Sequence, residues 1–385
     1  MKMDHEDHVQ LLRGMLQIYS PSGKEQKIVT FLQEKLVKFG FGNVRTDEAG
    51  NVYGEVGSGS PTILLCGHMD TVSGWIPVKR ENDCLTGRGA VDAKSSLAAM
   101  IFAASEAKSS LKRGRIIVAG VVEEEKTSKG IHQLLHQKLD VDYAVFGEPS
   151  GVKNITFAYK GKIGLRIKCQ TSSGHVGAQH LLENAAEKGF ELWQKIKDAC
   201  AQFQSPQGVF YSVTPCLTRI SSRRTSGGVP DVCVLNIDVR LPPSVKMDVL
   251  EKAISRAIND FRTSNPNVSV TYNVVDRVVP FVADRTTPLV KAWDRAIVEV
   301  TGGPAKFLRK TGTGDMNIFG AETGVPSATY GPGDSMLSHT KYERIDLSEY
   351  AASVQVYKRA VEILLNDADT KTSQKWLLRK RSQPF

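Results

Sequence analysis

Histidine and carboxylate side chains follow the predicted strands of this chain at the point where each strand ends. His68 and Asp70 come directly after the short apolar strand 63–66. Because alternate residues of an extended segment point to the same side, these two side chains can share one face. A carboxylate beside an imidazole fixes the tautomer of the imidazole, as metal-binding histidines usually require. A histidine and an aspartate at this spacing also occur in ordinary loops, so the pair gains meaning only from what lies near it.

Carboxylates recur after two further apolar strands, 116–122 and 143–146, and at the start of a predicted helix: Glu123, Glu124 and Glu125, then Glu148, then Asp92. Three adjacent carboxylates repel one another, so the Glu triplet is either a solvated acidic turn or a place where a divalent cation relieves the repulsion. Asp92 is either the N-cap of its helix or a ligand of the same cation. His339 lies far downstream, just before the last predicted helix.

These side chains together predict a metal centre. The carboxyl ends of strands are where α/β sheets place their sites, so one edge of a sheet can collect all of them. Nitrogen and carboxylate oxygen without thiolate suit zinc, cobalt or manganese. A spare carboxylate beside the ligands is the base that metal-assisted hydrolysis requires. The residues alone therefore favour a metal-dependent hydrolase.

Helices and strands alternate over the first 150 residues and again after Pro280, which predicts an α/β layer around a mostly parallel sheet. Helices are expected from Ser20 to Phe39 and from Lys94 to Ala107. The residues Asp346-Leu-Ser-Glu349 form a capping box for a last helix that ends near Leu365.

Between these parts the pattern changes to an α+β arrangement. It predicts a β-ribbon over 155–171 turned near Lys160-Gly161, helices over 178–200 and 249–261, a half-buried strand over 233–241 and a strand over 268–275. We therefore expect a discontinuous catalytic domain (1–154 and 277–370), an inserted domain (155–276) and a basic C-terminal tail (371–385).

Composition excludes several classes of protein. With 41% hydrophobic and 24% charged residues the chain is not globally disordered, and no apolar run approaches the ~18 residues of a membrane helix. The charged N-terminus lacks a signal-peptide core, so a soluble, cytoplasmic protein is expected. The six cysteines form no C-x-x-C pair, which predicts free thiols. The net charge of +9 comes without a zinc-finger spacing or an aromatic RNA-binding motif, so no nucleic-acid partner is expected.

The sequence resembles the co-catalytic di-zinc amidohydrolases, a family that includes aminoacylase, glutamate carboxypeptidase, acetylornithine deacetylase and succinyl-diaminopimelate desuccinylase. The motifs that carry the resemblance occur in order along nearly the whole chain: Gly67-His68-Met69-Asp70, Gly87-Arg88-Gly89 with Asp92-Ala93-Lys94, the Glu pair, Gly147-Glu148-Pro149, Gly174-His175, Asp238-Val239-Arg240 and Ser338-His339-Thr340. The resemblance implies a catalytic domain with an inserted lid or dimerisation domain, and a homodimer.

The resemblance also implies roles for individual residues. His68 and Glu148 bind one divalent metal ion, Glu125 and His339 bind a second, and Asp92 bridges both; the metal is zinc or cobalt. Glu124 is the general base and Asp70 orients His68. The register within the Glu triplet follows the family's spacing Glu124-Glu125-x-x-Ser128-x-Gly130. His175 stabilises the oxyanion, often across a dimer interface, and Arg240 lies near the substrate unless it forms only a structural ion pair.

Within the family, two segments resemble the enzymes that release lysine or ornithine from the γ-glutamyl C-terminus of the amino-group carrier protein LysW, a small acidic protein: 309–317, with Thr311, Asp315 and Asn317 as substrate contacts, and 330–335. Desuccinylase-type members carry asparagines where this chain has Ser226-Gly227-Gly228-Val229-Pro230, which argues against that substrate. The alternatives are a deacetylase, desuccinylase, dipeptidase or carboxypeptidase acting on a small free substrate, and a non-catalytic carrier-binding protein.

Overall fold

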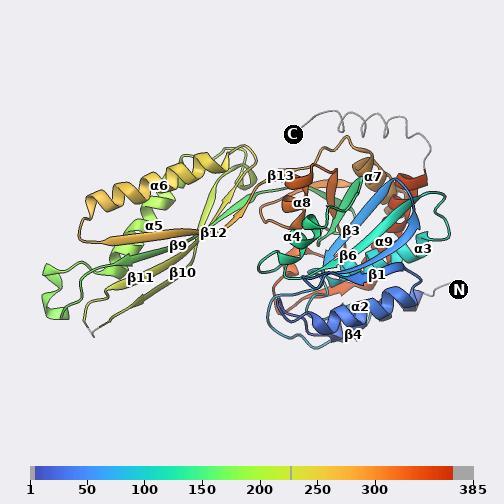
Figure 1. Cartoon of the computed structure of the whole chain (residues 1–385), viewed down its shortest axis with the longest axis horizontal. Coiled ribbons are helices and arrows are strands. Elements are labelled where there is room, and N and C mark those ends of the chain that lie inside the picture. Colours follow the sequence, from blue (N-terminus) through green and yellow to red (C-terminus); the bar gives the residue numbers. More distant parts are fainter. Residues whose placement is uncertain (1–4, 226–227, 367–385) are drawn as a thin grey trace. The chain divides into compact units, whose positions relative to one another are not determined.

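The computed structural model describes residues 5–225 and 228–366. These residues fold into two compact units (Figure 1). The first unit contains the chain up to Phe157, the segment 283–308 and the chain from Gly314 onward; the second contains 158–282 and 309–313. The short segment 309–313 was expected in the catalytic domain. The predicted tail, 371–385, lies outside the described residues.

A mixed sheet forms the centre of the first unit, in the strand order β1-β2-β6-β3-β7-β15-β8, with β13 and β14 next to β8. The central strands β6, β3, β7 and β15 run parallel, whereas β1, β2 and β8 pair antiparallel at the edges. The strand bounds are β1 Gly42–Thr46, β2 Val52–Ser58, β3 Thr62–His68, β6 Gly114–Val121, β7 Tyr143–Gly147, β8 Asn154–Tyr159, β13 Phe281–Val282, β14 Lys306–Lys310 and β15 Ser327–Tyr330. This confirms the predicted α/β class.

Helices cover this sheet, and one of them is nearly enclosed. The helices are α1 His5–Gln17, α2 Gln26–Lys38, α3 Lys94–Ala107, α4 Lys129–His136, α7 Pro288–Thr301, α8 Asp315–Thr323 and α9 Leu347–Asn366. Helix α3 packs against β3, β6 and β7 on one side and against α1 and α9 on the other. It is therefore apolar or small almost all round, and its predicted bounds are confirmed.

Helix ends agree only in part with the predicted signals. Helix α2 ends next to Phe39 as predicted, but it begins at Gln26 and not at Ser20, because Ser22 binds the Asp70 carboxylate instead of opening the helix. The Asp346 carboxylate accepts the backbone N–H of Glu349 at 2.9 Å and so caps α9, as predicted. The Glu349 side chain does not complete the box, because it accepts the N–H groups of Val152 and Gly333 instead. A small sheet of β16 Arg344–Asp346, β5 Cys84–Thr86 and β4 Lys79–Glu81, and the short helix η3 Ser335–Leu337, complete the first unit.

The second unit is an antiparallel sheet of four strands in the order β10-β11-β9-β12, with two helices packed together on one face. Its elements are β9 Gly161–Gln170, η1 Val176–Leu181, α5 Ala185–Ala201, η2 Val209–Tyr211, β10 Thr214–Arg223, β11 Val232–Leu241, α6 Met247–Ser264 and β12 Ser269–Val278. Strand β11 alternates between buried and partly exposed residues, as predicted. Its buried side chains pack against α5 and α6 in a core separate from that of the first unit.

Two predictions for this region were wrong. The strands of the predicted ribbon 155–171 do not pair with each other, because β8 belongs to the nine-stranded sheet and β9 to the four-stranded sheet. The predicted helix over 178–200 begins only at Ala185, where the Asn184 side chain accepts the N–H of Ala186. Residues 176–181 form the 3₁₀ helix η1 instead. No helix among residues 5–225 and 228–366 is both long and apolar enough to cross a membrane.

Candidate metal centre

His68 occupies the last position of β3, where the sheet ends. Its Nδ1 atom lies 2.9 Å from the backbone carbonyl of Asp70 and 3.5 Å from the Asp70 carboxylate. These contacts leave Nε2 facing the other carboxylates of the site. The Asp70 carboxylate is fully buried and also accepts the hydroxyl of Ser22 at 2.6 Å. Asp70 therefore lies where it can fix the orientation of the His68 ring.

Asp92 connects the two histidines of the site. Its Oδ1 lies 3.2 Å from Nε2 of His68, and its Oδ2 lies 3.3 Å from Nε2 of His339. The residue before helix α3 is Ala93, and no side chain caps that helix end. The alternative of a simple N-cap therefore does not describe Asp92. A carboxylate with one oxygen toward each histidine has the geometry of a bridging ligand.

The Glu triplet forms a tight turn after β6, and its three side chains separate. The Asp70 carboxylate accepts the backbone N–H groups of Glu124 and Glu125, at 3.1 and 3.2 Å. Glu123 has φ +55° and its carboxylate accepts the hydroxyl of Thr127, outside the site. The turn therefore presents Glu124 and Glu125 to the site, which supports the register chosen from the sequence.

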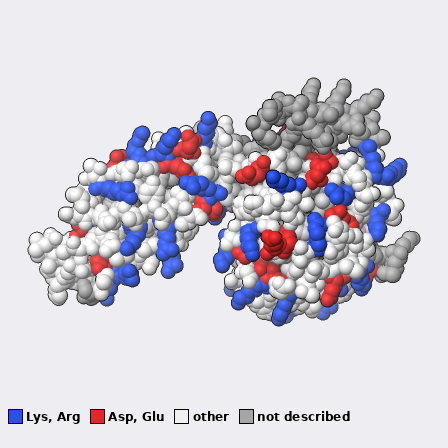
Figure 2. Space-filling model, viewed as in Figure 1, with Lys and Arg blue, Asp and Glu red and all other residues white. Residues whose placement is uncertain are grey.

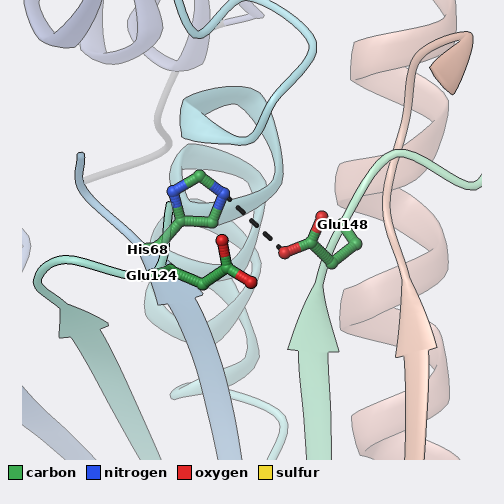
Figure 3. A group of neighbouring side chains, drawn as sticks. All are labelled: His68, Glu124 and Glu148. Atoms are coloured by element: carbon green, nitrogen blue, oxygen red, sulfur yellow. Dashed lines mark ion pairs between the residues drawn. The ribbon is translucent and has the colours of Figure 1, made fainter. Parts of the chain in front are cut away.

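Two groups of possible ligands share His68. One contains His68, Glu124 and Glu148, and the other contains His68, Asp92 and Glu125; within each group the ligand atoms lie within 4.8 Å of one another. Figure 3 shows the first group, with Glu124 between the other two side chains. His68 Nε2 lies 3.7 Å from Oε1 of Glu148. The distances alone would allow Glu124 to serve either as a metal ligand or as the general base.

The carboxylates of the site stabilise positive charge on the two neighbouring histidines. Hydrogen bonds with Asp92 and Glu125, the latter 3.0 Å from Nε2, raise the pKa of His339 to about 10. Burial alone would lower the pKa of His68, but its bonds to Asp70 and Asp92 outweigh burial and raise it. Burial and the neighbouring Glu148 raise the pKa of Glu124. Imidazole nitrogens and carboxylate oxygens crowded in this way fit divalent metal ions.

Three of the predicted residues lie in the second unit. His175 is exposed, and its Nδ1 accepts the backbone N–H of Gly177 at 3.1 Å. Neutral His175 therefore carries its proton on Nε2, which makes Nε2 a hydrogen-bond donor. Arg240 forms a two-bond ion pair with Asp238, at 2.6 and 3.1 Å, so the predicted structural alternative is present. Thr311 is exposed.

Asp315 and Asn317 lie in the first turn of α8. Asn317 is fully buried, and its Oδ1 accepts the N–H of Gly314, so its side chain caps this helix. Asp315 is 5% exposed, and its Oδ1 has no hydrogen-bond partner among the described residues. Burial raises the pKa of Asp315 to about 7. Ser226 and Gly227, on which the expectation about the desuccinylase substrate partly rests, lie outside the described residues.

Several residues that hold the site were not predicted from the sequence. Ser22 was expected only to open a helix, yet it binds Asp70. Arg88 was noted only as part of a motif, and Glu343 not at all, yet the two form a buried ion pair of 2.9 Å beside Asp92. The one signal for Glu343 was its position four residues after His339.

The fold and the site define a metal-dependent hydrolase of amide bonds. The chain belongs to peptidase family M20/M25/M40, whose model matches residues 64–363. Membership of this family implies divalent metal ions. The chain is 36% identical over 363 residues to the [LysW]-lysine hydrolase of Deinococcus radiodurans, covering 92% of this chain and 96% of that one.

Other known proteins are similar to this chain in sequence or in fold. The chain is 32% identical over 358 residues to the [LysW]-lysine/[LysW]-ornithine hydrolase of Saccharolobus islandicus, covering 92% of this chain and 95% of that one. Among solved structures, a tripeptidase from Staphylococcus aureus matches with TM-score 0.80 and 19% identity, covering 95% of this chain and all of that one. An M20 family metallo-carboxypeptidase from Sulfolobus solfataricus matches with TM-score 0.78 and 17% identity, over 94% and 99% of the two chains. These two structures support the fold.

Proposed function

We propose that this chain hydrolyses the amide bond between the γ-carboxyl group of the C-terminal glutamate of LysW and the α-amino group of lysine, ornithine or both. The observation that carries the proposal is the Asp92 carboxylate, which presents one oxygen to each histidine beside an additional carboxylate, Glu124. The identity of the proposed substrate is inferred from the names of the relatives, whose alignments cover more than nine-tenths of both chains. The acidic carrier would act as the macromolecular substrate.

The ligand set would hold two divalent metal ions, zinc or cobalt. His68 and Glu148 would bind one, Glu125 and His339 the other, and Asp92 both. When bound, the metal ions would lower the pKa of a water molecule and polarise the scissile carbonyl group. His339 is the exposed ligand, with 54% of its side chain accessible, so substrate would approach from its side of the site.

Glu124 would move the proton. Its carboxylate would take a proton from the attacking water molecule and later give it to the leaving α-amine. Asp70 would keep both His68 and the Glu124 backbone in place during these steps, since it binds each of them.

The second unit would contribute to substrate binding. The Nε2–H of His175 would donate a hydrogen bond to the oxyanion that forms at the scissile carbonyl. In a homodimer, this histidine would serve the site of the neighbouring subunit. Arg240, Thr311 and Asp315 would contact the substrate. Asn317 was also predicted as a contact, but it is fully buried and would instead act through the helix that it caps. We place the enzyme in the cytoplasm, together with lysine and arginine biosynthesis.

The test is a comparison of substrates with purified enzyme. Release of free amino acid is measured from LysW-lysine, LysW-ornithine, N-acetylornithine and succinyl-diaminopimelate at equal concentrations. The proposal expects kcat/KM for at least one LysW conjugate to exceed both small-substrate values by more than about 100-fold. Faster turnover of a small free substrate would establish the deacetylase or desuccinylase alternative instead. Binding of LysW-lysine without turnover in the metal-loaded enzyme would establish the non-catalytic alternative.

A further inference from the structure

A buried carboxylate, Glu343, holds the backbone that leads into Asp92. One of its oxygens, Oε1, accepts three backbone N–H groups, from Gly89 at 3.0 Å, Val91 at 3.0 Å and Asp92 at 2.9 Å. The other oxygen, Oε2, accepts the Arg88 guanidinium at 2.9 Å. Glu343 is 1% exposed. Its hydrogen-bonding capacity is therefore directed at the segment 88–92.

The bond to the Asp92 N–H bears on the metal centre directly. Asp92 must direct Oδ1 and Oδ2 at two different histidines at the same time, at 3.2 and 3.3 Å. A side chain with only two rotatable bonds can do so only if its own backbone is fixed. Glu343 supplies that fixation from a segment more than 250 residues away in the sequence.

Arg88 connects Glu343 to the backbone next to His339. Its Nη1 donates to the carbonyl of Thr340 at 2.9 Å as well as to Glu343, and its Nε donates to the carbonyl of Gly74 at 2.9 Å. His339 has φ +62°, in the left-handed region, which is uncommon for residues other than glycine. The neighbouring bonds therefore hold His339 in a conformation that its own backbone disfavours.

We propose that Glu343 is a positioning residue that sets the geometry of Asp92 and, through Arg88, of His339, and so raises the affinity of the site for its metal ions. The inference rests on the metal centre proposed above. A buried ion pair stabilises a fold little compared with apolar side chains of the same size, so burial of Arg88 and Glu343 is poorly explained by stability. Their contacts instead converge on two of the proposed ligands.

The test measures metal affinity in Glu343→Gln. The amide can still accept the three N–H groups, but its NH₂ group then faces the guanidinium of Arg88, donor against donor. Metal affinity is measured by competition with a chromophoric chelator well below the unfolding temperature of the metal-free protein. We expect affinity to fall by about 10- to 100-fold, the usual effect of losing a group that supports a metal ligand.

Asp142→Asn is the matched control. The Asp142 carboxylate also accepts a backbone N–H, that of Thr62 at 2.8 Å, but at the end of β3 opposite His68. This variant is expected to keep wild-type metal affinity even if its metal-free form unfolds more readily. If Glu343→Gln does not fold, metal affinity is measured in Arg88→Lys instead. The Arg88→Lys variant keeps the charge beside Glu343 but loses the planar group that reaches Thr340 and Gly74, and we expect a several-fold loss of affinity.

The outcomes distinguish failure of the proposed function from failure of the positioning role of Glu343 alone. Wild-type protein that binds no divalent metal would overturn the proposed function. Wild-type protein that binds metal, with Glu343→Gln or, failing that, Arg88→Lys binding it equally well, would overturn only the positioning role. A loss of affinity in Asp142→Asn as large as that in Glu343→Gln would also overturn it, because the effect would then follow general destabilisation.

Discussion

We predict that ionisation of Asp315 lowers the stability of the metal-free protein as the pH rises from acid to neutral. Asp315 is 5% exposed, one of its carboxylate oxygens has no hydrogen-bond partner among the described residues, and burial raises its pKa from 3.8 to about 7. Between these two values the folded state binds more protons than the unfolded state. Stability therefore falls as pH rises through this range.

The magnitude follows from the width of that range. Each pH unit changes the free energy of unfolding by up to about 1.4 kcal/mol, so the Asp315 contribution should fall by about 3 kcal/mol between pH 5 and pH 8. In Asp315→Asn this titration is absent. The variant should therefore gain stability relative to wild type by about 3 kcal/mol over the same interval, whatever the fixed effect of the amide itself.

Urea unfolding of both proteins at pH 5, 6, 7 and 8, in the presence of a chelator, measures this difference. Added metal should shrink it, because nearby cations favour the ionised carboxylate. Parallel stability curves for wild type and variant across this pH range would show that Asp315 does not titrate there and would refute the reasoning. A lower kcat/KM in the same variant would support the predicted substrate contact.

Four further predictions concern the reaction. Chelation should abolish activity while circular dichroism shows most of the fold retained, because two apolar cores do not depend on metal; full activity in metal-free protein would contradict the metallohydrolase assignment. Glu124→Gln should bind metal and lose at least about 100-fold in rate, the scale of a general base, whereas an inactive Glu123→Gln beside an active Glu124→Gln would shift the register by one residue. Mixed His175→Ala and Glu124→Gln protomers should regain activity in heterodimers if the histidine acts across the dimer; verified subunit exchange without recovery would place its action within one chain. High salt should lower kcat/KM for LysW-lysine several-fold but barely affect a short γ-glutamyl-lysine analogue, because screening shortens from about 10 Å at 0.1 M to about 3 Å at 1 M; equal responses would remove charge as an argument for the carrier.

The charge distribution refines the salt prediction. Figure 2 shows Lys and Arg side chains spread over the visible face of both units, with Asp and Glu among them. Five basic residues of the sequence lie after residue 370, outside the described part: Lys371, Lys375, Arg379, Lys380 and Arg381. Truncation before Lys371 should flatten the salt dependence if this segment steers the carrier, and should leave it intact if the described surface does.

The sequence predicted those parts of the fold that depend on local pattern. Helix α3 has the expected bounds because Leu97, Ala98 and Ile101 recur at helical spacing within a segment of 14 residues, which is too long for a typical buried strand. Strand β10 was missed because most of its residues are exposed and its sequence lacks alternation. The ribbon prediction failed because two adjacent apolar strands look the same whether they pair with each other or join two different sheets.

The site, too, contains some residues that the local sequence pattern predicts and others that it does not. His68, the Glu triplet and Glu148 could be singled out because each follows an apolar strand, a position that the local sequence pattern shows, whereas the register Glu124-Glu125 came from the family resemblance. The groups that hold them could not, since Glu343 and Ser22 act across long separations in the sequence. Hydrogen bonds within the chain hold the site together in the same way at Asp70, whose carboxylate accepts the backbone N–H groups of Glu124 and Glu125.

This arrangement has a consequence for metal binding. When a site forms only on metal binding, part of the binding free energy is used to order the chain, and chelation unfolds the protein. Here Asp70 and Glu343 together accept five backbone N–H groups from the two segments that carry Asp92, Glu124 and Glu125. Because these bonds join groups of the chain itself, we expect them to order the two segments whether or not metal is bound. Metal affinity should therefore depend on the carboxylates that orient the backbone as much as on the ligands.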